Sequence, residues 1–361
     1  MTSSDEIRTR FAGPGSGAPV YLPDLTLWYR WHTQRGALPA QWQGHTLPQI
    51  AEALGVPAWT VTRPWRVELS GIQVDTQEAA GQRTVRYRTP AGSLTAAWSL
   101  GPDGDWWQTE YPIKTLEDLP AARELISARA YLLDPLNPPS SLSSPSPPSS
   151  LRSLELPMRP YSDLLHTLLG WGDGLMLLMG EGRAALVEML GLLEEKLQAL
   201  VEQVAGLPGD LALAPDNLDG QYISPRVFRE QLAPNYRRTA DALHAAGKSL
   251  VVHVGGPVKR LLPLLAAAGV DAVEGIAPAP QSDATLAEAR TVAGPALTLW
   301  GGIPQDYLIA ERTTEEFERA VAEAIAQAAG DPRMILGVAD RVPVDADLGR
   351  LQALAGLAAR T

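Results

Sequence analysis

The feature that most limits the fold of this chain is a strict alternation of short apolar runs and helical patterns from residue 210 to residue 359. Each apolar run has a length typical of a strand, and each segment after it carries apolar residues at helical spacing. Five such units follow one another, namely 210–216 with 225–246, 249–254 with 257–268, 271–275 with 284–293, 296–302 with 314–329, and 333–339 with 346–359. Because parallel strands need crossover connections, usually helices, this repetition predicts a parallel sheet with helices on its faces.

Two architectures satisfy this order, a closed (β/α)₈ barrel and an open doubly wound sheet. An open sheet that binds a nucleotide carries a glycine-rich fingerprint or a Gly-Lys-Ser/Thr loop after a strand. Neither motif follows any of the predicted strands. With 361 residues, of which 45% are hydrophobic, the chain is long enough for a barrel with insertions. The sequence therefore predicts an α/β fold of the (β/α)₈ TIM-barrel type.

The first third of the chain has a mixed pattern, which predicts an N-terminal β-hairpin elaboration of the barrel. In "TVRYRTPAGSLTAAWSL" (84–100), apolar residues alternate on both sides of the turn Pro90-Ala91-Gly92, as is typical of a hairpin. Residues 115–132 predict a helix with Thr115 as its N-cap. Residues 181–206 predict a longer helix, because their apolar residues recur at helical spacing.

Two low-complexity segments limit the predicted domain. Residues 1–18 contain Gly, Ser and Pro and predict a flexible N-terminus. Residues 134–150, "DPLNPPSSLSSPSPPSS", have too little apolar surface to form a core. We interpret them as a loop that interrupts one barrel domain over 19–361, since the residues after them do not look like the beginning of a separate domain.

Composition excludes several classes of function. The chain has 30 Lys and Arg against 41 Asp and Glu, a net charge of −11, which disfavours binding to nucleic acid or to an anionic membrane. It has no cysteine, so thiolate catalysis and thiolate-ligated metals are excluded. The start "MTSSDEIRTR" lacks the apolar stretch of a signal peptide, and the apolar region 164–179 is interrupted and too short to span a bilayer. We expect a cytoplasmic protein.

Ionisable residues stand where most of the predicted strands end. In a parallel barrel, the carboxyl ends of the strands and the loops after them form the active site. Four of the five units end in an ionisable residue after an apolar run; the residues at the five ends are Asp216-Asn217, His253, Glu274, Trp300 and Asp340-Arg341. We expect these side chains, with Asp219, to meet at the mouth of the barrel. Gly255-Gly256, directly after the second end, would let backbone approach a ligand closely.

Each of these residues also has a purely structural interpretation. A histidine at a strand end can be hydrogen-bonded structure, Glu274 can form a cap or an ion pair, and Asp340 can form a local ion pair. Asp216 and Asp219 lie in "PDNLDG", which is rich in turn-forming residues. Trp300 can pack inside the barrel. The repetition at successive strand ends, more than any single residue, indicates a site.

Several stretches occur in the order found in one known family. They are "PDNLDGQYISPRVFREQLAPNYRR" (215–238), "GKSLVVHVGG" (247–256), "LLAAAGVDAVEG" (264–275), "LWGGIPQDYL" (299–308) and "ILGVADRVPVDADLGRLQAL" (335–354), preceded by "GAPVYLPDL" (17–25), "TPAGSL" (89–94) and "YPIKTLEDL" (111–119). With these stretches the chain resembles the uroporphyrinogen decarboxylase superfamily of (β/α)₈ barrels, nearest its cobalamin-linked methyltransferase branch. The resemblance implies an enzyme that moves a methyl group from or to a small or corrinoid-bound carrier. The corrinoid would be held by a partner protein.

The resemblance has two departures. Uroporphyrinogen decarboxylases carry an arginine-bearing segment after the first strand that binds substrate carboxylates, but residues 22–36 lack that motif although Arg30 and Arg35 are present. The methyltransferases hold zinc with a histidine and two cysteines. His253 matches the histidine, whereas Gly255 stands at the first cysteine position and Ala339-Asp340 falls near the second.

The residues at the strand ends leave two kinds of chemistry open. His253, Glu274 and Asp340 can bind a divalent metal, such as zinc, without cysteine ligands, or can act as general acid and base without a metal. In either case we expect a second group to position a small-molecule substrate, namely Asp216, Asn217, Asp219, Trp300 and Arg341.

Three functions compete on the sequence. The first is methyl transfer as described. The second is decarboxylation of uroporphyrinogen or another carboxylate, with Arg30, Arg63 or Arg341 neutralising the substrate's charge. The third is a non-catalytic binding or accessory protein that keeps the barrel. Because barrels of this superfamily often pair, a homodimer is a further expectation.

Overall fold

The computed structural model describes residues 3–134 and 150–358, which form two compact units by their mutual contacts. The first, called the barrel unit here, contains residues 3–63, 150–156 and 207–358. The second, the hairpin unit, contains residues 64–134 and 157–206. Of the predicted loop at 134–150, residues 135–149 lie outside the described residues. The single domain over 19–361 stays a prediction.

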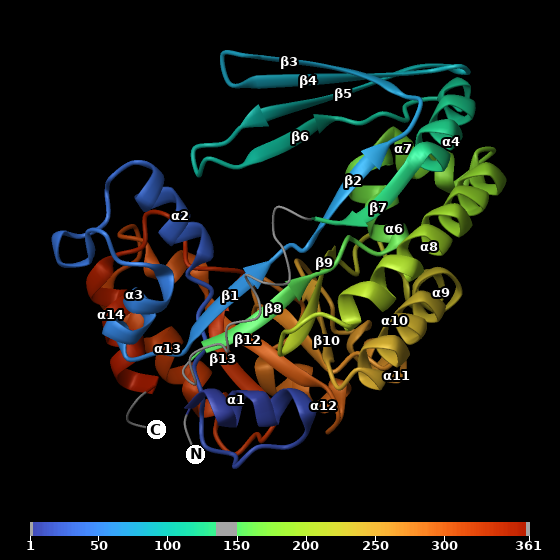
Figure 1. Cartoon of the computed structure of the whole chain (residues 1–361). Coiled ribbons are helices and arrows are strands. Elements are labelled where there is room, and N and C mark those ends of the chain that lie inside the picture. The colour runs from blue at the N-terminus through green and yellow to red at the C-terminus, as the bar shows by residue number, and fades with distance from the viewer. Residues whose placement is uncertain (1–2, 135–149, 359–361) are drawn as a thin grey trace. The chain divides into compact units, whose positions relative to one another are not determined.

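A seven-stranded parallel sheet forms the centre of the barrel unit (Figure 1). Its strands, in spatial order and in chain order, are β1 (Ala58–Thr62), β8 (Ser150–Glu155), β9 (Leu211–Leu218), β10 (Ser249–Val254), β11 (Ala272–Ile276), β12 (Thr298–Pro304) and β13 (Met334–Ala339). At the far edge of β13, Tyr21 pairs in parallel with Leu336 and adds an eighth strand position. The predicted (β/α)₈ TIM-type architecture is confirmed.

Helices follow these strands as the alternation predicts. They are α2 (Thr26–Gln34) and α3 (Leu47–Leu54) before β1, then α9 (Pro225–Val227) and α10 (Ala233–Ala245), α11 (Leu262–Ala267), α12 (Leu286–Ala293), α13 (Thr314–Ala328) and α14 (Leu348–Ala358). The N-termini of α3, α12 and α13 carry capping boxes at Thr46, Thr285 and Thr313. In a capping box, the threonine and a Glu or Gln three residues later satisfy each other's backbone N–H groups, so the starts of these helices are well defined.

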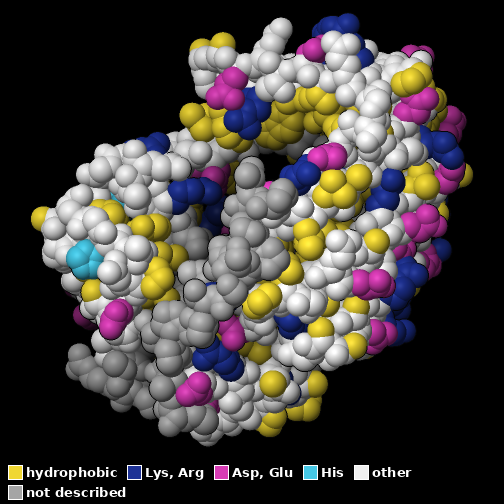
Figure 2. All heavy atoms as spheres, in the orientation of Figure 1, with side chains coloured by type: hydrophobic (Ala, Val, Ile, Leu, Met, Phe, Trp, Pro, Cys, Tyr) yellow, Lys and Arg dark blue, Asp and Glu magenta, His cyan; other side chains and the backbone are white. Residues whose placement is uncertain are grey.

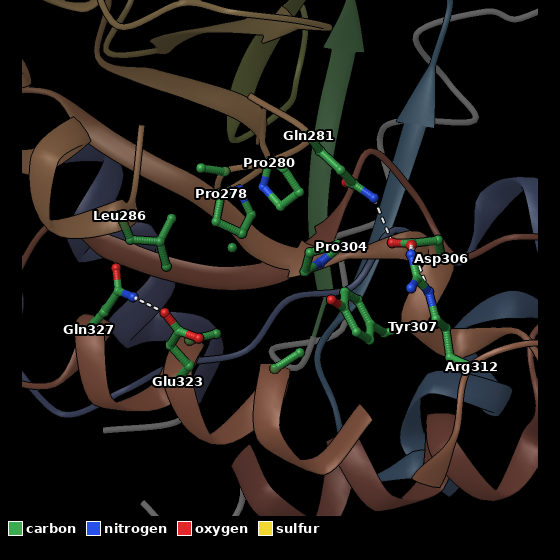
Figure 3. A pocket seen from close by; sticks show the side chains of 14 residues that line it. Pro278, Pro280, Gln281, Leu286, Pro304, Asp306, Tyr307, Arg312, Glu323 and Gln327 are labelled. Carbon is green, nitrogen blue, oxygen red and sulfur yellow. Dashed lines mark hydrogen bonds and ion pairs between the residues drawn. The ribbon is translucent and has the colours of Figure 1, made fainter. Parts of the chain in front are cut away.

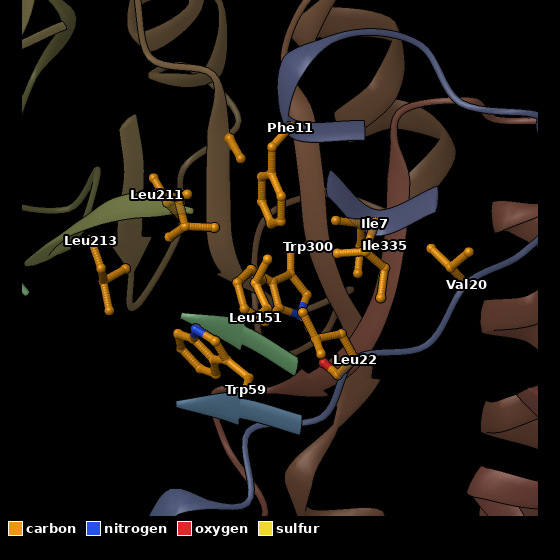
Figure 4. Packing of buried hydrophobic residues seen from close by; sticks show 12 residues of the cluster. Ile7, Phe11, Val20, Leu22, Trp59, Leu151, Leu211, Leu213, Trp300 and Ile335 are labelled. Carbon is orange, nitrogen blue, oxygen red and sulfur yellow. Dashed lines mark hydrogen bonds between the residues drawn. The ribbon is translucent and has the colours of Figure 1, made fainter. Parts of the chain in front are cut away.

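The core of the barrel unit is a cluster of buried apolar side chains to which every barrel strand contributes (Figure 4). Its members are Ile7, Phe11, Val20, Leu22, Trp59, Leu151, Leu211, Leu213, Val251, Ala272, Trp300 and Ile335. Trp300 is only 2% exposed, and its ring packs edge-on against Phe11 and Trp59 with centroids 5.8 and 4.6 Å away. Its indole N–H donates to the carbonyl of Leu22 at 2.9 Å, so a polar group in the core has its partner.

A helix near the start of the chain corrects the prediction of a flexible stretch over residues 1–18. Residues Ser3–Ala12 form α1, whose Ile7 and Phe11 are buried in the barrel core. Arg10 is also fully buried and donates to the carbonyl of Met334, the first residue of β13. The carbonyl of Arg10 accepts from Thr298, the first residue of β12. Helix α1 therefore covers the amino ends of the strands. The sequence did not predict this helix because most of its residues are polar and only Ile7 and Phe11 enter the core.

The hairpin unit contains antiparallel sheets (Figure 1). A four-stranded sheet consists of β3 (Gln73–Ala79), β4 (Gln82–Thr89), β5 (Gly92–Leu100) and β6 (Trp106–Glu110), and a pair consists of β2 (Trp65–Leu69) and β7 (Arg129–Leu133). Strands β4 and β5 are the predicted hairpin, with Val85 opposite Ala96 and Tyr87 opposite Leu94. The N-terminal hairpin elaboration is confirmed.

Helices complete the hairpin unit. They are α4 (Leu119–Ala128), α6 (Pro160–Asp163), α7 (Asp173–Met179) and α8 (Arg183–Ala205). The helix predicted over 115–132 ends at Ala128, because the residues after it pair with β2 as strand β7. Helix α8 lies within the long helix predicted over 181–206 and buries Leu186, Leu193 and Leu200.

The described residues contain no helix that is both long and apolar enough to span a membrane. On the face shown in Figure 2, basic and acidic side chains are intermixed rather than gathered by sign.

Candidate functional site

His253 and Glu274 lie side by side on neighbouring strands of the barrel. His253 is the second-last residue of β10 and is in register with Glu274 of β11. Residues in register on parallel strands present their side chains to the same face. Glu274 Oε2 lies 2.6 Å from His253 Nδ1 and accepts its hydrogen bond. The pair is largely shielded from solvent, with 18% and 7% of the two side chains exposed.

Asp340 brings a second carboxylate to the same imidazole. It follows the last residue of β13, and its Oδ1 lies 3.4 Å from His253 Nε2. One ligand atom each from His253, Glu274 and Asp340 lies within 4.8 Å of the others. The side chain of Asp340 is 42% exposed, so the group opens to solvent on this side.

Charge and burial together shift the pKa values of the pair. Burial alone would lower the pKa of His253, but the carboxylate of Glu274 and the charge of Asp340 outweigh it and raise that pKa to about 9. Burial raises the pKa of Glu274 to about 7, and the hydrogen bond from His253 offsets only part of this shift. Perturbed values of this kind are a mark of functional sites.

A cavity of about 150 Å³ adjoins this group at the carboxyl ends of the strands. It is lined by Val254, Gly255, Gly256, Gly275, Ala277, Gln281, Ser282, Gln305, Ala339 and Asp340. Gly275 has φ of +90°, and a Cβ there would lie 3.0 Å from the ring of His253 and 2.6 Å from the carbonyl of Val254. Glycine at this position therefore lets the imidazole reach Glu274.

Two residues predicted to bind substrate lie elsewhere, which corrects the prediction for both. Trp300 is not at a strand end, because β12 continues to Pro304, and its indole belongs to the core. Asp216 is fully buried and accepts a hydrogen bond from Tyr236 of α10. Since Tyr236 belongs to α10, Asp216 points toward the helix layer.

The other predicted residues lie at the mouth of the barrel. Arg341 Nε is 3.8 Å from Asp340 Oδ2, so the arginine partly balances that carboxylate. The side chains of Asn217 and Asp219 lie directly over the backbone of Gly255 and Gly256, two residues that line the cavity.

One acidic residue near the site was missed by the strand-end argument. Asp24 follows the eighth strand position, and its backbone carbonyl accepts from the N–H of Val342, two residues after Asp340. Burial raises the pKa of Asp24, and hydrogen bonds from Thr26 offset part of that rise. The run "PVYLPD" (19–24) carries part of the strand-end signal, an acid after an apolar run with α2 beginning two residues later at Thr26, but its two prolines are atypical of a strand.

A second cavity, of about 100 Å³, lies between β12, α12 and α13 (Figure 3). Prolines 278, 280 and 304 and Leu286 form an apolar wall, and Asp306 pairs with Arg312 at its rim. Gln281 lines this cavity as well as the one beside His253, and its amide donates to Asp306 at 2.5 Å. No residue predicted to carry chemistry is among those that line it.

The donor set at the first cavity fits a divalent cation. One imidazole and two carboxylates are ligands that zinc and other first-row divalent ions accept, and catalytic zinc sites commonly have three protein ligands with one open position. A cation here would take one ring nitrogen of His253 and one oxygen from each of Glu274 and Asp340. Three acids against one arginine near the imidazole also favour positive charge in the cavity.

Comparisons with known proteins agree with this architecture. The family model for uroporphyrinogen decarboxylase (URO-D) matches residues 174–360, which include β9 to β13 and the His253 group. Among solved structures, a methyltransferase from Methanosarcina mazei is similar with a TM-score of 0.60 and 13% identity, over 100% of this chain and 99% of that chain. At this identity the likeness shows the fold alone. No curated protein matches the chain. Since the family model spans more than half of its length, the chain belongs to the uroporphyrinogen decarboxylase family.

Proposed function

We propose that this chain is a methyltransferase-like enzyme that works at the cavity beside His253, with a divalent cation held by His253, Glu274 and Asp340. Zinc is the cation we expect. One of the two methyl carriers would be a small molecule, and the other a corrinoid on a partner protein. The observation that carries the proposal is the convergence of one imidazole and two carboxylates within 4.8 Å at the barrel mouth. The family membership and the methyltransferase fold neighbour support the class of reaction.

The side chains of the site divide the work. A bound cation supplies Lewis acidity, which lowers the pKa of an acceptor group placed against it. In the metal-free site, Glu274 fixes the orientation of His253 through the hydrogen bond at Nδ1; its carboxylate would become a ligand only when the cation displaces that proton. Asp340 lines the cavity and is partly exposed, so its carboxylate is placed to accept the proton that the acceptor loses.

The charge of the site disfavours the decarboxylase alternative. Uroporphyrinogen is a polyanion, and its carboxylates would be repelled by Glu274, Asp340 and Asp24. Two of the arginines predicted to neutralise the substrate's carboxylates already have acidic partners. Arg63 lies 4.0 Å from Glu155, and Arg341 lies 3.8 Å from Asp340. Arg30 is exposed on α2.

Metal analysis of purified protein tests the cation. We expect about one equivalent of zinc per chain after incubation with Zn²⁺ and gel filtration, and a loss of at least tenfold in affinity for His253→Ala. His244→Ala is the matched control, because His244 also pairs with one carboxylate, Asp271 at 2.8 Å, but with no third ligand among the described residues. Stoichiometric zinc in His253→Ala, or none in the wild type, contradicts the proposed cation site.

A second assay tests the reaction. We expect wild-type protein, but not His253→Ala, to consume methylcobalamin in the presence of a thiol, which absorbance follows directly. Formation of a partially decarboxylated product from uroporphyrinogen would instead support the decarboxylase alternative. If the protein is inactive in both assays, the result would support a non-catalytic accessory protein. A cytoplasmic location and a homodimer stay predictions; sedimentation tests the second.

A further inference from the structure

The second cavity, between β12, α12 and α13, has an apolar wall and charged groups at its ends. The wall consists of proline rings and other apolar side chains, namely Pro278, Pro280, Leu286, Pro304, Ala320 and Ala324. Figure 3 shows Glu323 and Gln327 at one end of the hollow and Asp306 and Arg312 at the other. An apolar pocket with a few polar groups at its edge is typical of small-molecule sites.

The charges at one end of this cavity already neutralise each other. The carboxylate of Asp306 accepts hydrogen bonds from the Gln281 amide at 2.5 Å and from Arg312 Nε at 3.0 Å. The guanidinium of Arg312 also lies over the ring of Tyr307, 4.9 Å from its centroid. Arg312 is therefore held at this end and does not reach a second carboxylate across the cavity.

Glu323, at the other end, has a neutral partner. The amide of Gln327 donates to its Oε1 at 3.0 Å, and within the part of the chain that the structure describes no lysine or arginine forms an ion pair with it. Its side chain is exposed, so the carboxylate is open to a ligand. The lining thus carries two carboxylates against one guanidinium, and the surplus of negative charge favours a cation.

The volume of the cavity limits the apolar part of that ligand. An engineered cavity of roughly 150 Å³ with apolar walls binds benzene. The cavity beside α13 measures about 100 Å³. By that comparison it has room for an apolar group of about four carbon atoms.

We propose that this cavity binds a small alkylammonium ion, with an alkyl group of about four carbon atoms against the prolines and its ammonium group at Glu323. The alkyl group leaves water there, and the ammonium donates to the carboxylate. The proposal does not depend on the proposed function. Because Gln281 lines both cavities, a bound ligand would contact one wall of the cavity beside His253.

Ligand-observed NMR titration of the full-length protein tests the site with three probes of similar length, n-butylammonium, n-butanol and butyrate. We expect n-butylammonium to bind with a Kd of about 1–10 mM, because it buries only a few methylene groups. At low salt, n-butanol should bind about threefold more weakly, because it lacks the charge. Butyrate should bind most weakly, because Glu323 repels it. Equal affinity for the three probes would show that the ligand class is wrong.

Two variants on α13 separate the apolar contact from the charge. Ala320→Leu places side-chain atoms in the cavity and should weaken n-butylammonium binding at least about fivefold, whereas Ala322→Leu, at an exposed position outside the lining, should not. Glu323→Gln keeps the shape and should bind n-butylammonium no more tightly than n-butanol. Glu318→Gln is its control, since Glu318 is exposed on the same helix and does not line the cavity.

Asp340→Asn shows which cavity the probe occupies. Of the two cavities, Asp340 lines only the one beside His253, so this variant should bind n-butylammonium as the wild type does. A loss of binding in Asp340→Asn, unchanged binding in Ala320→Leu, or no saturable binding to the wild type overturns the proposal. None of these results bears on zinc binding, which the metal analysis of His253→Ala tests separately. Circular dichroism confirms that each variant is folded.

Discussion

His253 has a carboxylate near each of its two ring nitrogens, and this arrangement links the protonation of one residue to the stability of the metal-free protein. The pKa of His253 is raised to about 9, above the value of about 6.5 in an unfolded chain. Below pH 6.5 both states hold the proton. Between pH 6.5 and 9 only the folded state keeps it, so the stabilisation is lost as pH rises through 9.

We therefore expect the free energy of unfolding of the metal-free protein to fall between pH 6.5 and pH 9, by at most about 3 kcal/mol. Glu274, whose pKa is raised to about 7, adds a fall in the same direction at lower pH. Urea denaturation with a chelator present, at several pH values, measures the slope. In His253→Gln the free energy of unfolding should no longer fall above pH 7, whereas in His244→Gln it should fall as in the wild type. If the two variants show the same dependence on pH, the explanation is wrong.

Gly255 and Asn217 form a second residue-scale test. Gly255→Ala places a Cβ on the amide oxygen, and since that oxygen ends an exposed side chain that can turn away, we expect a loss of under about 1 kcal/mol. The double variant Asn217→Gly/Gly255→Ala should recover most of that loss, because the clashing amide is gone. A double-mutant cycle from thermal unfolding measures the coupling. A larger loss that the double variant keeps would show that the new Cβ meets another group.

Single residues also show which parts of the candidate site could be predicted from the sequence and which could not. Ends of apolar runs led to His253, Glu274 and Asp340, which the structure brings together. The same rule failed for Trp300, since the last residue of β12 cannot be read from a run that continues through glycines. It failed for Asp216 because a strand position one residue away faces the opposite side of the sheet.

At the scale of elements, helix α1 closes the amino-terminal end of the barrel by packing against its core. Its Phe11 is 3% exposed and meets Trp300 edge to face. We expect Phe11→Ala to lower the free energy of unfolding by about 3–5 kcal/mol. Met176→Ala is the control, since Met176 is 69% exposed and its replacement should cost under about 0.5 kcal/mol. Chemical denaturation compares the two, and similar losses would mean that α1 does not pack as described.

Elements were predictable where local signals agree with tertiary structure. Apolar residues at helical spacing located α12 and α13, whose starts are also capped, and alternation around a turn located β4 and β5. Helix α1 could not be predicted, because its burial depends on distant partners such as Met334 and Thr298. The first barrel strand is equally hidden, since Tyr21 becomes part of the sheet only through its pairing with Leu336.

At the scale of the whole molecule, the proposed cation should stabilise the barrel. A ligand that binds only the folded state at one hundred times its Kd adds about 2.7 kcal/mol. For a chain of 361 residues this raises Tm by a few degrees. We expect Zn²⁺ to raise Tm of the wild type and of His244→Ala, and a chelator to reverse the rise. Differential scanning calorimetry checks this, and an equal rise in His253→Ala would place the cation elsewhere.

The hydrogen bond from Val342 to the carbonyl of Asp24 joins the beginning of the barrel to its end, right beside Asp340. During synthesis, a nascent barrel that has not yet received β13 already contains the imidazole and its first carboxylate but lacks the other. Such a fragment has only two of the three groups, so the proposed cation site would be complete only once β13 has joined the sheet.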